Sequence, residues 1–282
     1  MRTATRHGDR RAVARAVTVV ALGAIVFAPV AVFAVMSILT RESVLAGSLY
    51  LRDVTLDHYH EVFARVDVLK LLRDSTLLAL SSSFLALAVG VVAAYFTSRG
   101  RGRLPEQLYT LCMSVWFVPP IALSLELYLW FQRLGLYDRM AGLILLYAAI
   151  HASLVVVLLA PYWDAISRRI DEAAWLDGYS GFAVIARIHL PALSPLFAGV
   201  FALAFLRSWN ELLFASLLTD WRVSTLPVAM LGLTTGSHIE WGQIAALGTI
   251  SLLPAPAAGM AVWLAFQRIS PSTRLRSARE AP

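Results

Sequence analysis

Apolar residues are gathered in six long blocks that alternate with shorter polar segments. Each block is long enough to cross a bilayer, because about 20 helical residues span the hydrocarbon core. A helix also satisfies its own backbone hydrogen bonds, which lipid cannot do. The pattern therefore predicts an all-α, polytopic membrane protein with six transmembrane helices. The blocks cover residues 16–39, 75–97, 107–131, 140–161, 194–218 and 244–266.

Prolines interrupt several of these blocks. Pro119 and Pro120 are adjacent in the third block, where two backbone donors are missing and the freed carbonyl groups must face protein or water. Pro29 is a tolerated kink in the first block, and the sixth block contains Pro254 and Pro256. We therefore expect the third span to be broken at its proline pair.

The fifth block carries a polar cluster. Ser194 is predicted to cap the helix with Pro195 as its first residue, and the helix is expected to run to about Leu218. Charged and amide side chains are expensive in lipid, so the cluster is expected to line the interior of the helix bundle. The cluster consists of Arg207, Trp209, Asn210 and Glu211.

Composition supports a membrane protein and excludes several chemistries. The chain has 282 residues, of which 59% are hydrophobic and 15% charged. Soluble domains are nearer ~45–50% apolar and ~25% charged. The single cysteine, Cys112, lies in an apolar block, so neither a disulfide framework nor a thiolate metal site is expected. The arginines are scattered between blocks, which argues against a nucleic-acid surface.

No phosphate-binding loop of the Gly-x-x-x-x-Gly-Lys-Ser/Thr type occurs in the sequence. We therefore expect no cofactor in this chain and no ATP hydrolysis by it. The first apolar block has 24 residues, longer than the ~7–15 residues of a signal-peptide core, so it is expected to remain as the first helix.

Positive charge predicts the orientation. With six spans, Lys and Arg number fifteen in the segments on one side of the membrane and eight on the other. Because cytoplasmic segments carry the excess of positive charge, both termini are expected in the cytoplasm. The chain then divides into a cytoplasmic N-terminal segment (1–15), a six-helix domain (16–268) with a cytoplasmic loop at 161–193, and a cytoplasmic tail (269–282).

The loop at 161–193 has the pattern of two short amphipathic helices. Gly178 can take the left-handed conformation that closes the first helix, and Ser180 is a suitable N-cap for the second. Pro191 is expected to end the second helix. Ala173 and Ala174 keep one face of the first helix small enough for close docking. On periodicity alone, a solvated connecting loop is an equally good interpretation.

Glu172-Ala173-Ala174, Gly178 and Ile188-x-Leu190-Pro191 resemble the EAA loop of binding-protein-dependent ABC importer permeases. In that family the loop is the coupling helix, which sits in a cleft of a cytoplasmic ATPase. The resemblance implies the type I importer permease fold. It also implies three kinds of partner: a second permease subunit, an ATPase dimer that binds ATP and Mg, and an external solute-binding protein. The implied coupling residues are Glu172, Ala173, Ala174, Asp177, Gly178, Ile188, Leu190 and Pro191.

Trp209-Asn210-Glu211 resembles the signature of MalG-like carbohydrate permeases, and Leu226-Pro227-Val228 is also similar to that family. Asp57-His58-Tyr59 resembles a family segment that has Asn where this chain has His58. The resemblance implies a sugar importer in a bacterial inner membrane. Aromatic, amide and carboxylate side chains suit a sugar path, although a structural role for each is equally compatible. The candidate path residues are Trp116, Tyr128, Trp209, Asn210 and Glu211.

Two other functions remain open from the sequence. A permease for amino acids, peptides or phosphate would share an EAA-type loop. An intramembrane enzyme could use Glu126, His151 or Glu211 as an acid or base, but the sequence shows no nucleophile–base pair and no metal-ligand spacing beside them.

Overall fold

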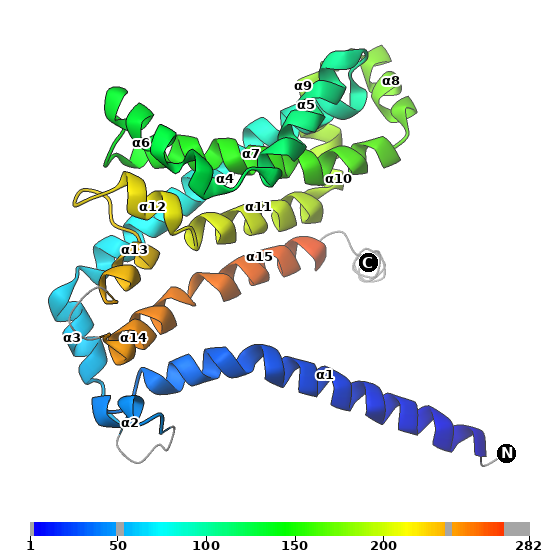
Figure 1. The fold of residues 1–282 in the computed structure, drawn as a ribbon. Coiled ribbons are helices and arrows are strands. Elements are labelled where there is room, and N and C mark those ends of the chain that lie inside the picture. Colours follow the sequence, from blue (N-terminus) through cyan, green and yellow to red (C-terminus); the bar gives the residue numbers. More distant parts are fainter. Residues whose placement is uncertain (1–2, 49–53, 235–238, 268–282) are drawn as a thin grey trace, which may run out of the picture. The chain divides into compact units, whose positions relative to one another are not determined.

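The computed structural model describes residues 3–48, 54–234 and 239–267 (Figure 1). These residues form helices and turns, and their one extended pairing is an isolated antiparallel bridge between Leu39 and Val54. Among these described residues, four helices are long and apolar enough to cross a membrane, or up to six spans if each of two bent pairs is one span. The predicted all-α membrane fold is confirmed. The expected cytoplasmic tail at 269–282 lies outside the described residues.

Two parts of the chain are described separately. The first comprises the described residues of 1–68 and 230–253, and the second those of 69–229 and 254–267. In the first part, α14 packs against α1, α2 and α3. The helices of this part are α1 (Thr3–Met36), α2 (Arg41–Leu45), α3 (Asp57–Arg65) and α14 (Trp241–Ser251).

α3 carries the segment in which His58 replaces the family's usual Asn. His58 is buried, and its Nε2 donates to the carbonyl of Leu39 at 2.9 Å. Gly242 of α14 lies so close to the His58 ring that a Cβ there would collide with it. The glycine is therefore required for the close approach of these two helices.

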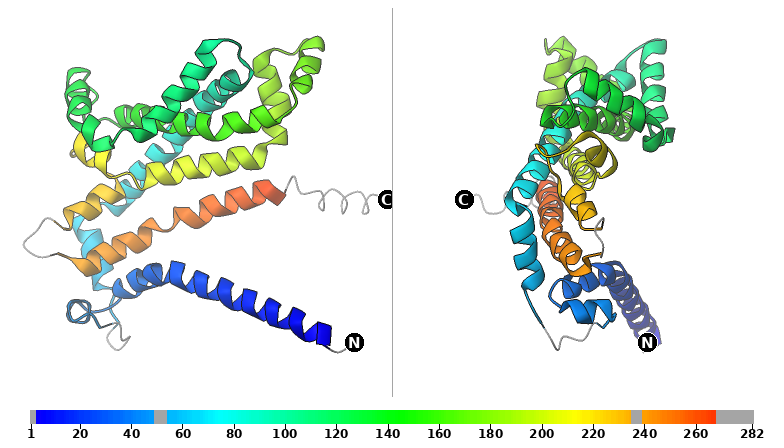
Figure 2. Two further views of the ribbon diagram at one scale, coloured as in Figure 1. Left: turned by 45° about the vertical axis from the view of Figure 1, so that its right-hand side comes forward. Right: turned by 60° about the vertical axis from the view of Figure 1, so that its left-hand side comes forward.

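The second part contains the long helices α4 (Val68–Arg99), α7 (Met140–Ala165), α11 (Ser194–Trp209) and α15 (Pro254–Gln267). α11 lies beside α15 in both views of Figure 2. Gly90 of α4 meets Val155 of α7 so closely that an added Cβ would overlap it, so a residue without a side chain allows the close packing of these helices. The second and fourth predicted spans are confirmed, and α7 continues through Pro161.

The third span is broken, as its prolines predict. α5 (Arg103–Ser114) and the short turns η1 (Val115–Phe117) and η2 (Pro120–Leu123) lead into α6 (Ser124–Arg133). The two halves, 103–117 and 120–133, are bent by 99°.

The predicted fifth and sixth helices are each divided into two helices in the structure. α11 ends at Trp209 and α12 (Leu213–Leu218) follows, so Asn210 and Glu211 lie in a break and not inside a continuous helix. The Glu211 carboxylate accepts from the backbone N–H groups of Phe214 and Ala215 at 2.9 and 3.1 Å, which satisfies the first turn of α12. The expected sixth helix is likewise divided at 252–253, before Pro254.

The start of α11 also differs from the expectation. Leu193, not Ser194, is the N-cap residue, and no side chain caps the helix. The bend of 91° between residues 181–192 and α11 sets the chain direction at this point, so capping by Ser194 is not what begins the helix.

The loop at 219–225 precedes α13 (Leu226–Gly232) and is held by carboxylates. Asp138 has a left-handed backbone (φ 52°), and its side chain accepts from the N–H groups of Asp220, Arg222 and Val223 at 3.0, 3.0 and 3.2 Å. Burial alone would raise the pKa of the Asp138 carboxyl, but these hydrogen bonds outweigh burial and hold the pKa below its usual value.

Candidate functional site

The segment that resembles a coupling loop forms a hairpin of two helical arms, hereafter the hairpin. The first arm is α8 (Arg168–Leu176), and the second is the run 181–192, made of α9 (Gly181–Val184), a π-helical turn η3 (Ile185–His189) and α10 (Leu190–Ala192). Gly178 joins the arms with φ +84°, and the Ser180 side chain accepts from Ala183 N–H at 3.3 Å. Both local predictions are confirmed.

The prediction that Pro191 ends the second arm is wrong. The helical run passes through it to Ala192 and turns at Leu193, whose N–H donates to the His189 carbonyl at 2.8 Å. Proline has a backbone angle that suits a helix and lacks only its donor, so it is tolerated in the first turn of α10.

Three buried charged or polar side chains tie the hairpin to the end of α4. Asp171 of α8 is 1% exposed, and its Oδ1 accepts from His189 Nε2 at 2.7 Å. Its other oxygen accepts from Arg99 Nε at 2.6 Å, and Arg99 also donates to the Ile166 carbonyl at 3.1 Å. This network therefore joins both arms of the hairpin to a spanning helix.

Neither Arg99 nor Asp171 is among the site residues predicted from the sequence, because they belong to separate elements and are 72 residues apart. Aromatic rings of Tyr95 and Trp163 pack against His189 at centroid distances of 5.9 and 6.0 Å, which excludes water from the contact. The charges are paired and desolvated together, so each depends on the others.

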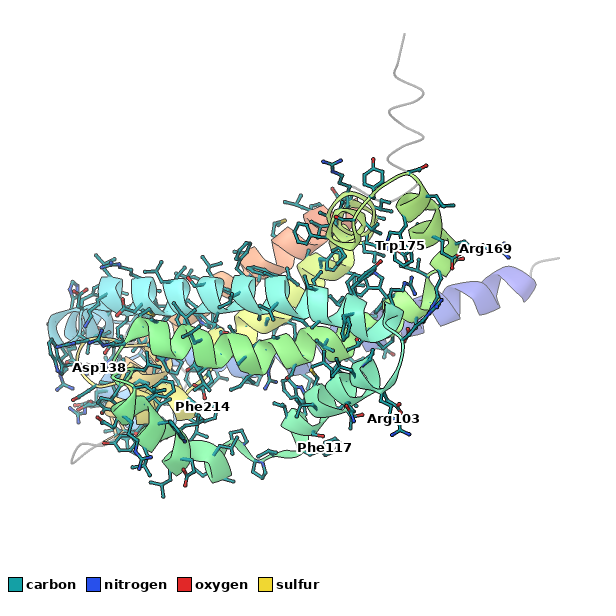
Figure 3. The ribbon with its side chains drawn as sticks, turned by 90° about the horizontal axis from the view of Figure 1, so that it is seen from above. Arg103, Phe117, Asp138, Arg169, Trp175 and Phe214 are labelled. Atoms are coloured by element: carbon teal, nitrogen blue, oxygen red, sulfur yellow. The ribbon has the colours of Figure 1, made fainter. Side chains whose placement is uncertain are left out.

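The hairpin exposes large apolar side chains on a surface that also carries charged ones. Leu176 is 89% exposed, Phe182 71% and Trp175 48%. Figure 3 shows Trp175 and Arg169 beyond one end of α4 and α7, with Asp138 and Phe214 at the other end. Large exposed apolar side chains gathered on one element are typical of an interaction surface.

The eight predicted coupling residues all lie in the hairpin, but they differ in exposure. Ala174 is 4% exposed and belongs to the interior of the hairpin, whereas Ala173 beside it is exposed. Ile188 is partly buried. The remaining members are exposed: Glu172, Asp177, Gly178, Leu190 and Pro191.

The five predicted path residues occupy separate settings. Trp209 is buried and stacks on Phe205 with centroids 5.9 Å apart, and the Asn210 side chain donates to the Leu206 carbonyl at 2.8 Å. Glu211 accepts a short hydrogen bond from the Tyr147 hydroxyl in addition to its bonds at α12. These contacts give each of the three a structural role.

Trp116 and Tyr128 come from the two halves of the broken third span. Tyr128 packs edge-on against Tyr137 at 5.5 Å and accepts from Gln132 at 3.2 Å. Trp116 lies beneath the Arg207 guanidinium, whose central carbon is 4.7 Å from the ring centroid. Arg207 belongs to the polar cluster predicted in the fifth block, but its contact with Trp116 was not predicted from the sequence.

A chain of buried hydroxyl and imidazole groups links three spans. Ser208 Oγ lies 3.0 Å from His151 Nδ1 and 2.9 Å from Ser82 Oγ. Although a serine beside a histidine is the arrangement of a nucleophile and its base, both side chains are buried, at 4% exposure each. The pair therefore joins helices and has no surface on which a substrate could react.

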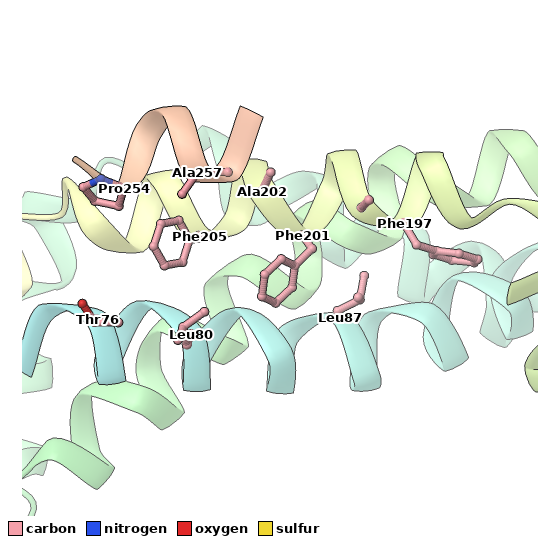
Figure 4. A pocket seen from close by; sticks show the side chains of 11 residues that line it. Thr76, Leu80, Leu87, Phe197, Phe201, Ala202, Phe205, Pro254 and Ala257 are labelled. Atoms are coloured by element: carbon pink, nitrogen blue, oxygen red, sulfur yellow. The ribbon is translucent and has the colours of Figure 1, made fainter. Parts of the chain in front are cut away.

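A cavity of about 510 Å³ lies between α4, α11 and α15 (Figure 4). Its walls are apolar apart from Thr76, and Phe201 and Phe205 of α11 face Leu80 of α4. Hydroxylated solutes are oriented by placed polar groups, and this cavity offers almost none. It is therefore a poor candidate for a sugar path.

Comparison with known proteins identifies relatives of this chain in sequence and in fold. A family described as binding-protein-dependent transport system inner membrane component matches residues 86–268, which include the hairpin. The chain is 31% identical over 207 residues to the inner membrane ABC transporter permease protein YcjP of Escherichia coli (strain K12), covering 71% of this chain and 72% of that protein.

A second relative is the trehalose/maltose transport system permease protein MalG of Thermococcus litoralis. It is 29% identical over 245 residues, which cover 83% of this chain and 87% of that protein. Among solved structures, a chain of a bacterial ABC transporter involved in the import of the acidic polysaccharide alginate superposes with a TM-score of 0.71. The superposition covers 92% of this chain and 97% of that one at 19% identity, so it shows a shared fold.

Proposed function

The chain belongs to the family of inner membrane components of binding-protein-dependent transport systems, and we propose that a separate ATPase docks on its hairpin and drives uptake of a sugar. As a member of the family, it is a multi-pass permease subunit of an importer. The permease would work with a second permease subunit, an ATPase dimer that binds ATP and Mg, and an external solute-binding protein.

The anchored hairpin is the observation that carries the proposal. Its outer surface offers exposed Leu176, Phe182 and Trp175, and Asp171 fastens its base to Arg99 of α4. A docking element must both bind its partner and transmit force, because a loosely attached loop would move without moving the bundle. The hairpin combines an apolar contact surface with a buried connection to a spanning helix, which suits both requirements.

The excess of Lys and Arg supports a cytoplasmic hairpin and cytoplasmic termini. Uptake of a sugar is supported by the relative from Thermococcus litoralis, whose name is that of a trehalose/maltose permease. Closing of the ATPases would displace the hairpins and reorient the bundle between outward-open and inward-open states.

Replacing Leu176 by Asp tests the docking surface. Because burying a leucine is worth about 2 kcal/mol, the charged variant should weaken attachment of the ATPase by more than tenfold. Attachment is measured by co-purification of the tagged complex, and ATP hydrolysis stimulated by the binding protein is measured in proteoliposomes. Glu172→Lys, on the same exposed surface, should also weaken attachment.

Leu104→Asp is the matched control, since Leu104 is 65% exposed at the start of α5 and lies outside the hairpin. It should retain the ATPase at the wild-type ratio. If Leu176→Asp and Glu172→Lys also retain it and hydrolysis stays coupled to uptake, the hairpin is only a connector.

A further inference from the structure

Arg207 is a cation within the fifth span. It lies about 20 Å along α11 from Ser194, at ~1.5 Å per residue, which is well inside a hydrocarbon core about 30 Å thick. Its side chain is exposed on the isolated chain, and no carboxylate of the described residues lies within 4.0 Å of it. A charged side chain at such depth faces a cavity or protein and not lipid.

Glu211 is the acid expected to neutralise Arg207, because residues four apart on a helix are neighbours. The break after Trp209 removes that arrangement. The Glu211 oxygens are instead engaged by the Tyr147 hydroxyl and by the N–H groups of Phe214 and Ala215. The positive charge of Arg207 therefore has no counter-ion on its own helix.

The indole of Trp116 places beside this charge a hydrogen-bond donor without a partner in the described part of the chain. Its ring lies 4.7 Å below the Arg207 guanidinium, and its buried Nε1 makes no hydrogen bond among the described residues. Stacking on an indole leaves the N–H edges of a guanidinium free for in-plane hydrogen bonds. Guanidinium and indole groups only donate, so the ligand that fits them must accept.

We propose that Arg207 recognises an anionic group on the transported solute, which makes the solute an acidic sugar bearing a carboxylate, sulfonate or phosphate. The inference rests on the proposed function and names its substrate class. A planar or tetrahedral oxyanion can accept two parallel bonds from one guanidinium, and such charge-assisted bonds exceed those of a neutral hydroxyl. The uncompensated charge also raises the local concentration of anions.

Quenching of Trp116 fluorescence tests the anion site without knowledge of the solute. In the purified complex, the difference between wild type and Trp116→Phe isolates the emission of Trp116. Iodide, an anion, should quench this emission several-fold more strongly in wild type than in Arg207→Gln, whereas neutral acrylamide should quench both equally. Arg207→Lys, which keeps the charge, should retain most of the iodide effect.

Equal iodide quenching in wild type and Arg207→Gln would overturn the inference. An acidic residue of the second permease that neutralises Arg207 would give this result. The fluorescence measurement does not depend on sugar transport, so it decides the anion site even if the proposed function fails.

The substrate class is tested by mass spectrometry. The solute is released by denaturing the binding protein that stimulates this importer, and is then identified. An acidic sugar is expected, and Arg207→Gln should reduce its uptake by roughly tenfold or more while the binding protein's affinity is unchanged. A neutral sugar, or normal uptake of an acidic sugar by Arg207→Gln, would overturn the inference and leave the proposed function intact. A wild-type complex that no binding protein stimulates would instead defeat the proposed function.

Discussion

His189 Nε2 lies 2.7 Å from an oxygen of Asp171, and the two residues are 2% and 1% exposed. They are 18 residues apart and belong to different arms of the hairpin. Arg99, 72 residues from Asp171, contacts the other carboxylate oxygen from the end of α4. Since a buried ionic contact tolerates little displacement, movement of the hairpin is expected to carry α4 with it.

Asp171→Ala should loosen the hairpin. Arg99 and His189 would lose their shared acceptor, and removal of one partner from a buried ionic contact costs about 3–5 kcal/mol. We expect lower thermal stability and fewer solute molecules imported per ATP hydrolysed, measured in proteoliposomes. Asp177→Ala, at an exposed acid of the same hairpin, should change stability by less than about 0.5 kcal/mol. An equal loss of thermal stability in the two variants would contradict a structural role for the buried network.

Ala173→Trp and Ala174→Trp should fail for different reasons. Ala174 is buried, so the larger ring would overpack the hairpin by about 1–3 kcal/mol and lower its stability. Ala173 is exposed, so its variant should fold normally and lose the ATPase through a collision at the docking surface. Limited proteolysis of the hairpin and co-purification of the ATPase separate the two effects. Normal ATPase retention by Ala173→Trp would place the docking surface elsewhere on the hairpin.

Glu211→Leu should destabilise the break between α11 and α12. The change leaves the Tyr147 hydroxyl and two backbone N–H groups without their acceptor, at a cost of about 1–3 kcal/mol for each buried group. Glu126→Leu, the same change at an exposed acid of α6, is the control and should assemble normally. Assembly is measured by the thermal unfolding of the purified complex in detergent. A stable Glu211→Leu complex with an altered solute range would show that Glu211 binds solute instead.

Asp138→Asn should free the loop at 219–225 and remove its pH dependence. The folded state lowers the pKa of Asp138, so its stabilisation is present above the unfolded value of about 4 and is lost as pH falls through the folded value. The protection factors of the backbone amides of residues 220–223 in wild type should therefore fall below about pH 4. The variant should exchange faster already at neutral pH, whereas Asp220→Asn should match wild type. Slow exchange in Asp138→Asn would show that another contact holds the loop.

Cysteine labelling should reveal the orientation. In a background with Cys112→Ser, Ser43→Cys is expected to react with an impermeant thiol reagent in intact cells, and Ser167→Cys only after permeabilisation. The expectation follows from the excess of positive charge in the hairpin and terminal segments. Reversed labelling would place the hairpin outside the cytoplasm and exclude docking of an ATPase on it.

Many local features of this protein could be predicted from its sequence. Apolar blocks of spanning length, the break at Pro119-Pro120, the left-handed Gly178 and the Ser180 cap each depend on residues close together in the chain. Backbone hydrogen bonding and proline geometry act over that short range, so such features are visible without a tertiary structure.

Only the tertiary structure decided which polar groups meet. Asp171 shares its carboxylate with Arg99 and His189, and Glu211 caps α12 and binds Tyr147 rather than pairing with Arg207. The sequence likewise could not tell buried Ala174 from exposed Ala173, because both have the same side chain on one short helix. These outcomes depend on how helices distant in sequence pack, since packing determines which charges lose water and which partners can replace it.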